Sequence, residues 1–294
     1  MVEKRQVISS LYPTTASLYR SLGWEVAGGW NRTVISAADL PAPSGTLEWG
    51  PVAHTEPDLA SVYEACAEAR DGWIVPPRRW WHAQGRRREV GTRPIWSWIG
   101  RRDGQAVAAA VYHHTDSERA MFDVEVDLVV GSDGPALSDA LAFVGASGTT
   151  VDRVRTSLPP TVLRTHLAEP SRTRSVEDWP WMLRLVDPPA AIAARGWPAG
   201  LTLVVELSVV PPTPRPDPVA AEHWVLEVAG GTAVLSPGGA HNVTIAATDL
   251  ARLYAGAVDP GALAAAGRLT GADADTVSGL RAAFAGDPSS PFFF

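Results

Sequence analysis

Few side chains of this sequence could act as a nucleophile, a Schiff-base amine or a metal ligand. Lys4 is the only lysine and Cys66 the only cysteine. This excludes a Walker phosphate loop, a Schiff-base lysine, an internal disulfide and a zinc cluster built on cysteines. His113 and His114 are adjacent in a predicted strand and therefore point to opposite faces, which is wrong for chelating one metal. The remaining histidines show neither ligand spacing nor a Ser-His-Asp order: His54, His82, His166, His223 and His241.

The charge balance excludes other function classes. Acidic residues outnumber basic ones by 32 to 25, giving a formal charge of −7, which disfavours capture of nucleic acid or of an anionic membrane. Arginines and tryptophans at residues 78–88 could suggest a nucleic-acid patch, but the overall acidity favours a solvated or subunit-facing loop. With no signal peptide, no apolar run of about 18 residues and one cysteine, we expect a cytoplasmic protein.

Three acidic residues alternate with apolar ones in a predicted strand at residues 122–130. Asp123, Glu125 and Asp127 could attract a polycationic substrate. We interpret them instead as the wet face of an ordinary half-buried strand.

The first segment, residues 1–36, predicts a strand, a helix and a strand. Residues 7–11 are short and apolar, residues 13–22 favour a helix that Gly23 ends, and Trp24 resumes extended structure. A piece of about 35 residues cannot bury a core by itself. We therefore expect it to be the end of a domain that begins upstream.

The middle segment, residues 37–178, alternates helices and strands as a complete α/β domain does. Pro57 suits the first position of a helix with four residues on one apolar face, which makes Cys66 a core residue. That face comprises Leu59, Val62, Tyr63 and Cys66. Strands are expected at residues 106–112, 122–130 and 151–156, and a helix at about residues 132–147.

The last segment, residues 179–294, changes to short strands followed by helices, which favours a separate α+β domain. Thr248 could cap one helix, Pro260 begins another, and Asp273 or Asp275 begins a third. Strands are expected at residues 181–186, 201–209, 223–228 and 243–246.

The prolines of residues 211–218 exclude a regular helix or a central strand. We interpret this run as a stiff surface loop between strands; an interdomain linker and a proline-motif ligand are the alternatives.

Four segments share their order and spacing with one known family. They are residues 11–24 (LYPTTASLYRSLGW), 181–197 (WMLRLVDPPAAIAARGW), 250–256 (LARLYAG) and the terminal Phe292–Phe294. The first has the tyrosine, three residues, glycine, aromatic pattern that resembles the closing helix and strand of a GNAT acyltransferase domain. Together the segments resemble the enhanced intracellular survival (Eis) acetyltransferases over nearly the whole chain.

The resemblance implies a three-part protein. Residues 1–36 would be the remnant of an acetyl-CoA-binding GNAT domain, residues 37–178 a degenerate GNAT-like domain, and residues 179–294 a domain similar to sterol carrier proteins. It also implies a homohexamer that transfers acetyl from acetyl-CoA to amines, including aminoglycoside-type or other polyamine substrates.

The resemblance further implies two catalytic residues: Tyr19 protonates the leaving thiolate, and the terminal carboxylate of Phe294 accepts the amine proton. A phenol, with a reference pKa of about 10, can donate at pH 7 when it is positioned. A terminal carboxylate, with a reference pKa of about 3.5, is a weak base unless burial raises its pKa, which three phenylalanines could achieve. Without the resemblance, we would interpret Tyr19 as a surface helix residue and the terminal phenylalanines as a tail docked in an apolar groove.

GNAT domains hold the cofactor pyrophosphate at a helix start, in a loop of the form Arg/Gln-x-x-Gly-x-Gly/Ala. Residues 101–106 (RRDGQA) match this form, yet they lie between extended segments, and Asp103-Gly104 is a strong hairpin signal. We therefore interpret them as a turn and expect the true loop upstream of residue 7, so that no cofactor-binding residue is assigned here.

Two functions remain. The first is an Eis-like N-acetyltransferase whose activity is doubtful without the upstream loop. The second is a non-catalytic binding or scaffold protein with a hydrophobic cavity like that of sterol carriers.

Overall fold

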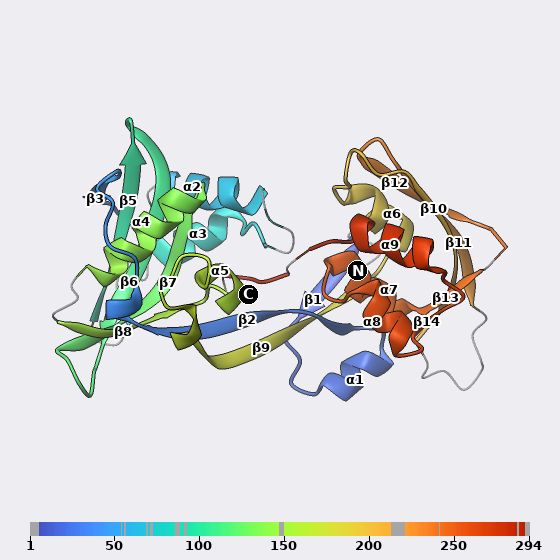
Figure 1. Cartoon of the computed structure of the whole chain (residues 1–294), viewed down its shortest axis with the longest axis horizontal. Helices are drawn as coiled ribbons and strands as arrows, with labels where there is room; N and C mark the ends of the chain where they lie inside the picture. Colours follow the sequence, from blue (N-terminus) through green and yellow to red (C-terminus); the bar gives the residue numbers. More distant parts are fainter. Residues whose placement is uncertain are drawn as a thin grey trace. The chain divides into compact units, whose positions relative to one another are not determined.

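The computed structural model describes residues 6–53, 55, 57–68, 70, 73–85, 89–90, 93–146, 150–212, 221–240, 242–286 and 288–291. The chain divides into two compact units, whose elements can be followed in Figure 1. The composite unit comprises residues 1–29 and 180–288, and the central unit comprises residues 30–179 and 289–294. Strands β2 (Glu25–Ser36) and β9 (Arg174–Leu185) each begin in one unit and end in the other.

The central unit is built on a mixed sheet. Its strand order is β2-β8-β7-β6-β5-β3, with β7 and β8 parallel and the other neighbours antiparallel. The strands not yet defined are β3 (Glu48–Pro51), β4 (Glu89–Val90), β5 (Arg93–Arg102), β6 (Gln105–Thr115), β7 (Phe122–Gly131) and β8 (Val151–Thr156). The helices are η2 (Ala37–Asp39), α2 (Pro57–Glu68), α3 (Arg78–Gly85), α4 (Gly134–Gly145), α5 (Pro160–Leu163) and η3 (Pro170–Arg172).

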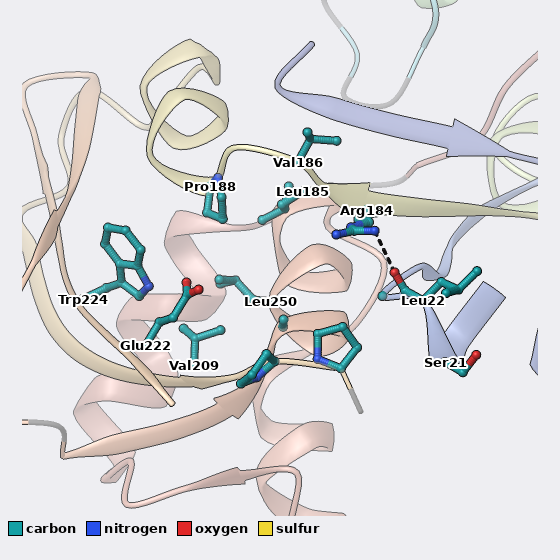
Figure 2. Close-up of a pocket in the computed structure, with 14 residues that line it drawn as sticks. Ser21, Leu22, Arg184, Leu185, Val186, Pro188, Val209, Glu222, Trp224 and Leu250 are labelled. Carbon is teal, nitrogen blue, oxygen red and sulfur yellow. Dashed lines mark hydrogen bonds between the residues drawn. The ribbon is translucent and has the colours of Figure 1, made fainter. Parts of the chain in front are cut away.

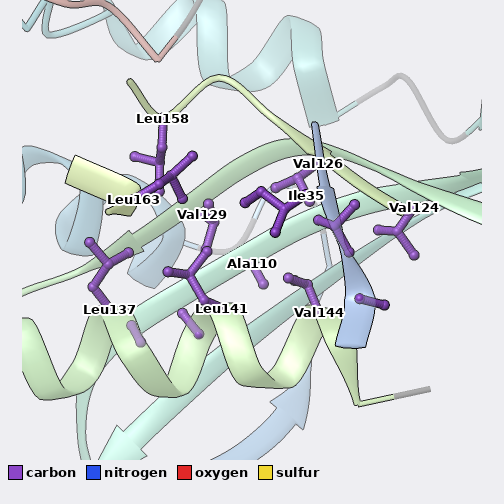
Figure 3. Close-up of a cluster of buried hydrophobic side chains, with 14 of the residues drawn as sticks. Ile35, Ala110, Val124, Val126, Val129, Leu137, Leu141, Val144, Leu158 and Leu163 are labelled. Atoms are coloured by element: carbon purple, nitrogen blue, oxygen red, sulfur yellow. The ribbon is translucent and has the colours of Figure 1, made fainter. Parts of the chain in front are cut away.

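Apolar residues on both faces of this sheet form two cores. Val124 and Val126 of β7 pack with α4, and Figure 3 shows the aliphatic side chains of that cluster between the helix and the strands. Leu128 and Val130 pack with α2 on the other face. As predicted, α2 begins at Pro57, and all four residues of its apolar face are buried, Cys66 among them.

The composite unit contains a five-stranded sheet with the order β12-β11-β10-β13-β14. Only β10 and β13 are parallel among these neighbours. Its strands are β10 (Leu203–Val210), β11 (Glu222–Ala229), β12 (Thr232–Pro237), β13 (Val243–Ala246) and β14 (Leu269–Thr270). Its helices are α6 (Pro188–Ala194), α7 (Ala247–Ala255), α8 (Pro260–Ala265) and α9 (Ala274–Ala283). One cluster of buried side chains, including Leu226 and Leu253, fills the space between the sheet and the helices.

Helix starts in this unit follow the sequence signals with one exception. Asp259 and Asp273 cap α8 and α9 through their carboxylates, as the proline and aspartate signals indicated. The predicted cap Thr248 is wrong: α7 begins at Ala247, directly after β13, and its N-cap Ala246 makes no side-chain hydrogen bond. Residues 213–218 of the proline-rich run lie outside the described residues, so the prediction of a stiff surface loop stays a prediction.

The first segment of the chain joins the composite unit rather than forming a core of its own. Strand β1 (Ile8–Leu11) pairs antiparallel with β9, and α1 (Ala16–Ser21) connects β1 to β2. Ala27, Trp181 and Leu183 form a buried cluster against Tyr254 of α7. No helix in the described ranges is long and apolar enough to cross a membrane.

Candidate functional site

Tyr19 lies in the last turn of α1, and backbone hydrogen bonds fix the conformation of the residues that follow it. Its carbonyl accepts hydrogen bonds from the N–H groups of both Leu22 and Trp24, at 3.0 Å each. Gly23 ends the helix with a φ of +96°, a conformation that favours glycine. Gly23 therefore sets the end of α1, after which the chain continues into β2.

An aromatic contact and a cation–π contact stabilise this turn. The half-buried Tyr19 ring meets the Trp24 ring edge-on, with centroids 6.3 Å apart. Arg184 of β9 places its guanidinium carbon 4.9 Å from the Trp24 ring centroid and donates a hydrogen bond to the Leu22 carbonyl at 2.9 Å. Arg184 therefore ties the end of α1 to β9 by a cation–π contact and a backbone hydrogen bond.

A buried carboxylate holds the other side of the same turn. Glu25 is 4% exposed and accepts hydrogen bonds from Arg20 Nε at 2.8 Å and from the Val26 N–H at 2.9 Å. The pair joins α1 to the first residues of β2. Because burying an unpaired carboxylate is costly, Arg20 and Glu25 stabilise each other's positions beside Tyr19.

Phe294, the other expected catalytic residue, lies outside the described residues. The preceding residues 289–291 belong to the central unit, and Ser290 is 1% exposed. The convergence of Tyr19 and the terminal carboxylate stays a prediction.

The loop that resembles a pyrophosphate site is a β-hairpin turn, as predicted. Asp103 and Gly104 join β5 to β6 with φ angles of 51° and 77°. Positive φ at both central residues is the geometry of a type I′ turn. A turn between two strands offers no helix N-terminus to an anion.

A second possible anion site lies where β7 leads into α4, the strand–helix–strand unit that continues to the parallel strand β8. Here the Asp133 carboxylate caps the helix through the Ala136 N–H at 2.7 Å and pairs with Arg102 at 2.7 Å. Hydrogen bonds from Arg102 and from that N–H lower the pKa of Asp133. The helix start is therefore filled by the chain's own carboxylate and does not fit a pyrophosphate group.

The acidic face of β7 differs from expectation. Asp123 is 3% exposed and pairs with Arg155 of β8 at 2.9 Å. Glu125 is ion-paired with Arg32 of β2. Only Asp127 keeps moderate exposure, and it contacts His113 Nδ1 at 3.0 Å. The prediction of a wet strand face therefore fails for Asp123, which is buried, and holds best for Asp127; arginines of β8 and β2 pair with Asp123 and Glu125.

One polar contact had no signal in the sequence. Ser138 Oγ of α4 lies 2.7 Å from Nδ1 of His166, which follows α5. Burial lowers the pKa of His166, so the neutral imidazole links α4 to this turn. A serine in the middle of a regular helix lacks the exposed turn that activates a nucleophile, and we assign the pair a structural role. In the part of the chain that the structure describes, no group of three or more histidine, cysteine or acidic side chains could hold a metal ion.

A cavity of about 440 Å³ opens in the composite unit, lined by residues that were not predicted as a site. Figure 2 shows its wall, to which the end of α1, the end of β9, β10, β11 and α7 contribute. Leu185, Val209 and Leu250 supply apolar surface, and Arg184 and Glu222 supply charge. The cavity is therefore amphipathic, and its wall includes the turn that follows Tyr19.

The comparisons with known proteins agree with this architecture. Residues 188–293 match the sterol carrier protein domain model. No curated protein matches the sequence. Several solved structures align with 100% of this chain, among them the following three; an identity below about one quarter shows the fold alone. A GCN5-related N-acetyltransferase from Anabaena variabilis ATCC 29413 has a TM-score of 0.87 at 23% identity, over 74% of that chain. One from Kribbella flavida has a TM-score of 0.79 at 28% identity, over 72% of that chain. Eis1 from Mycobacterium abscessus has a TM-score of 0.76 at 19% identity, over 74% of that chain.

These similarities confirm the predicted fold class. The chain has the fold of GCN5-related N-acetyltransferases, the GNAT superfamily, together with a C-terminal sterol carrier protein domain.

Proposed function

We propose that this chain, with its GNAT fold and sterol carrier domain, acts in an Eis-type N-acetyltransferase. The reaction would transfer acetyl from acetyl-CoA to a primary amine of an aminoglycoside-type or other polyamine substrate, in a homohexamer. The observation that carries the proposal is the alignment of the whole chain with N-acetyltransferase structures, Eis1 among them.

In the proposed reaction, the neutral amine attacks the thioester carbonyl, the new C–N bond forms and the C–S bond breaks. The amine loses a proton to the Phe294 carboxylate, and the departing sulfur takes a proton from the Tyr19 phenol. The edge-on contact of Trp24 with the Tyr19 ring supports this role, because a donor must be held in place to protonate a leaving group efficiently. Arg184 and Glu25 stabilise the turn that follows Tyr19.

The central unit has no part in cosubstrate binding in this proposal. Asp133 fills the α4 start, and residues 101–106 form a hairpin turn. The described residues of that unit instead supply a packed support with two cores.

The proposal is tested with the purified full-length protein, including any segment encoded in frame upstream of Met1, with acetyl-CoA and a panel of amines, by measuring release of the coenzyme A thiol. We expect Tyr19→Phe to lower kcat by about 10²-fold with little change in KM, because it removes only the donated proton. Tyr254→Phe, another partly buried tyrosine of the composite unit, should keep normal turnover. One glycine added after Phe294 should reduce kcat similarly, because it moves the carboxylate.

If Tyr19→Phe turns over as fast as Tyr254→Phe, Tyr19 is not the proton donor. Absence of turnover with every amine, together with no calorimetric binding of acetyl-CoA, would overturn the enzyme proposal and favour the binding or scaffold protein.

A further inference from the structure

Glu222 stands at an inward-facing position of the sheet in the composite unit. Side chains at alternate positions of a strand share one face. Trp224, Leu226 and Val228 follow Glu222 at this spacing, and Leu226 and Val228 are fully buried in the core. Its antiparallel partner Val209 is also buried. A carboxylate therefore occupies a register that the rest of the strand fills with apolar residues.

Glu222 is exposed to solvent, whereas Leu226 and Val228 on the same face of the strand are buried. Leu226 and Val228 pack beneath the helices, whereas Glu222 lies at the strand end, where the cavity reaches the sheet. Figure 2 shows the Glu222 side chain between Trp224 and Leu250, on the side of Pro188. Glu222 therefore keeps access to water while projecting over an apolar wall.

Arg184, the other charged residue of the cavity wall, already has partners within the protein. Arg184 donates to the Leu22 carbonyl and lies over the Trp24 ring, so it is held at the α1 end of the cavity. Across the described ranges, no hydrogen bond or ion pair engages the Glu222 carboxylate. The available charge in the cavity is therefore negative, beside the indole of Trp224, whose face also attracts cations.

We propose that this cavity binds a small organic cation, an ammonium group carried on an apolar or aromatic body. The ammonium would pair with Glu222, and the body would pack on Leu185, Val209, Leu250 and Trp224. The volume of about 440 Å³ lies within the usual range for small-molecule sites. The inference does not depend on acetyl transfer, and its test needs no acetyl-CoA.

The test uses three probes with the same indole body in calorimetric titrations of the full chain: tryptamine, tryptophol and indole-3-propionate. We expect tryptamine to bind at least about tenfold more tightly than the neutral tryptophol, because an ammonium–carboxylate hydrogen bond is charge-assisted. Indole-3-propionate should bind most weakly. Glu222→Gln should weaken tryptamine about tenfold and leave tryptophol nearly unchanged.

The matched control is Glu227→Gln. Glu227 lies on the same strand and is exposed on the opposite, outward face, so its loss changes the net charge equally without changing the cavity. Equal weakening by both variants, tighter binding of indole-3-propionate than of tryptamine, or no binding of tryptamine at millimolar concentration would each overturn the proposal. Because none of these titrations uses acetyl-CoA, each outcome can be interpreted even if the protein does not transfer acetyl.

Discussion

A buried carboxylate of α7 lies between two arginines. Asp249 is 1% exposed and accepts hydrogen bonds from Arg252 at 3.3 Å and from Arg268 at 2.8 Å. Removing one member of a buried pair leaves the other charges uncompensated. We expect Asp249→Ala to lower the free energy of unfolding by about 2–3 kcal/mol. This is less than the largest cost of breaking a fully buried ion pair, because Arg268 is 44% exposed. Urea denaturation measures this difference.

Asp275→Ala is the matched control for that measurement. Asp275 is also an acidic residue in the first turn of its helix, α9, but it is exposed. Its removal should cost only about 0.5 kcal/mol through the helix dipole. Similar losses for the two variants would show that Asp249 acts through the dipole and not through its arginine partners.

Helices α8 and α9 are joined by one ion pair. Asp259 caps α8 through the Ala262 N–H at 3.1 Å and accepts a hydrogen bond from Arg281 Nη2 of α9 at 2.9 Å. Arg281 is the main cause that lowers the pKa of Asp259 to about 2. Since the folded-state pKa lies below the unfolded value, the stability that this contact contributes is complete above about pH 4 and is lost as the pH falls towards 2.

Carboxyl-carbon NMR titration tests this pair directly. We expect the pKa of Asp259 to be about 2 in the parent chain and to rise towards its ordinary value in Arg281→Met. Asp273, which caps α9 through the Thr276 N–H, should titrate alike in both proteins. An unchanged Asp259 titration in Arg281→Met would mean that the helix cap alone lowers its pKa.

The sequence predicted those elements whose boundaries carry local signals. Proline and aspartate starts predicted α2, α4, α8 and α9, and Asp103-Gly104 predicted the β5–β6 turn. The ion pairs of Asp123 and Glu125 on β7 were not predicted, because their partners Arg155 and Arg32 lie on β8 and β2, and no local pattern shows which strands lie close together in the sheet.

The candidate site was predictable only in part. The resemblance singled out Tyr19, but Arg184 reaches its turn from a strand that is distant in the sequence, so spacing could not reveal the contact. Glu222 did have a usable signal. Glu222 lies two residues before Trp224, so it extends the alternation of Trp224, Leu226 and Val228 by one inward position. It was missed because the predicted strand began at His223, one residue too late.

At the scale of the whole molecule, the hydrophobic clusters divide between the two units. Each cluster of described residues lies within one unit: Leu141 is buried in the central unit and Leu226 in the composite unit. Because cooperative unfolding follows contiguous cores, we expect two calorimetric transitions. Leu226→Ala and Leu141→Ala, each removing a fully buried side chain at a cost of about 3 kcal/mol, should lower different transitions. If both variants instead shift one common transition equally, the shared strands β2 and β9 couple the units into a single folding unit.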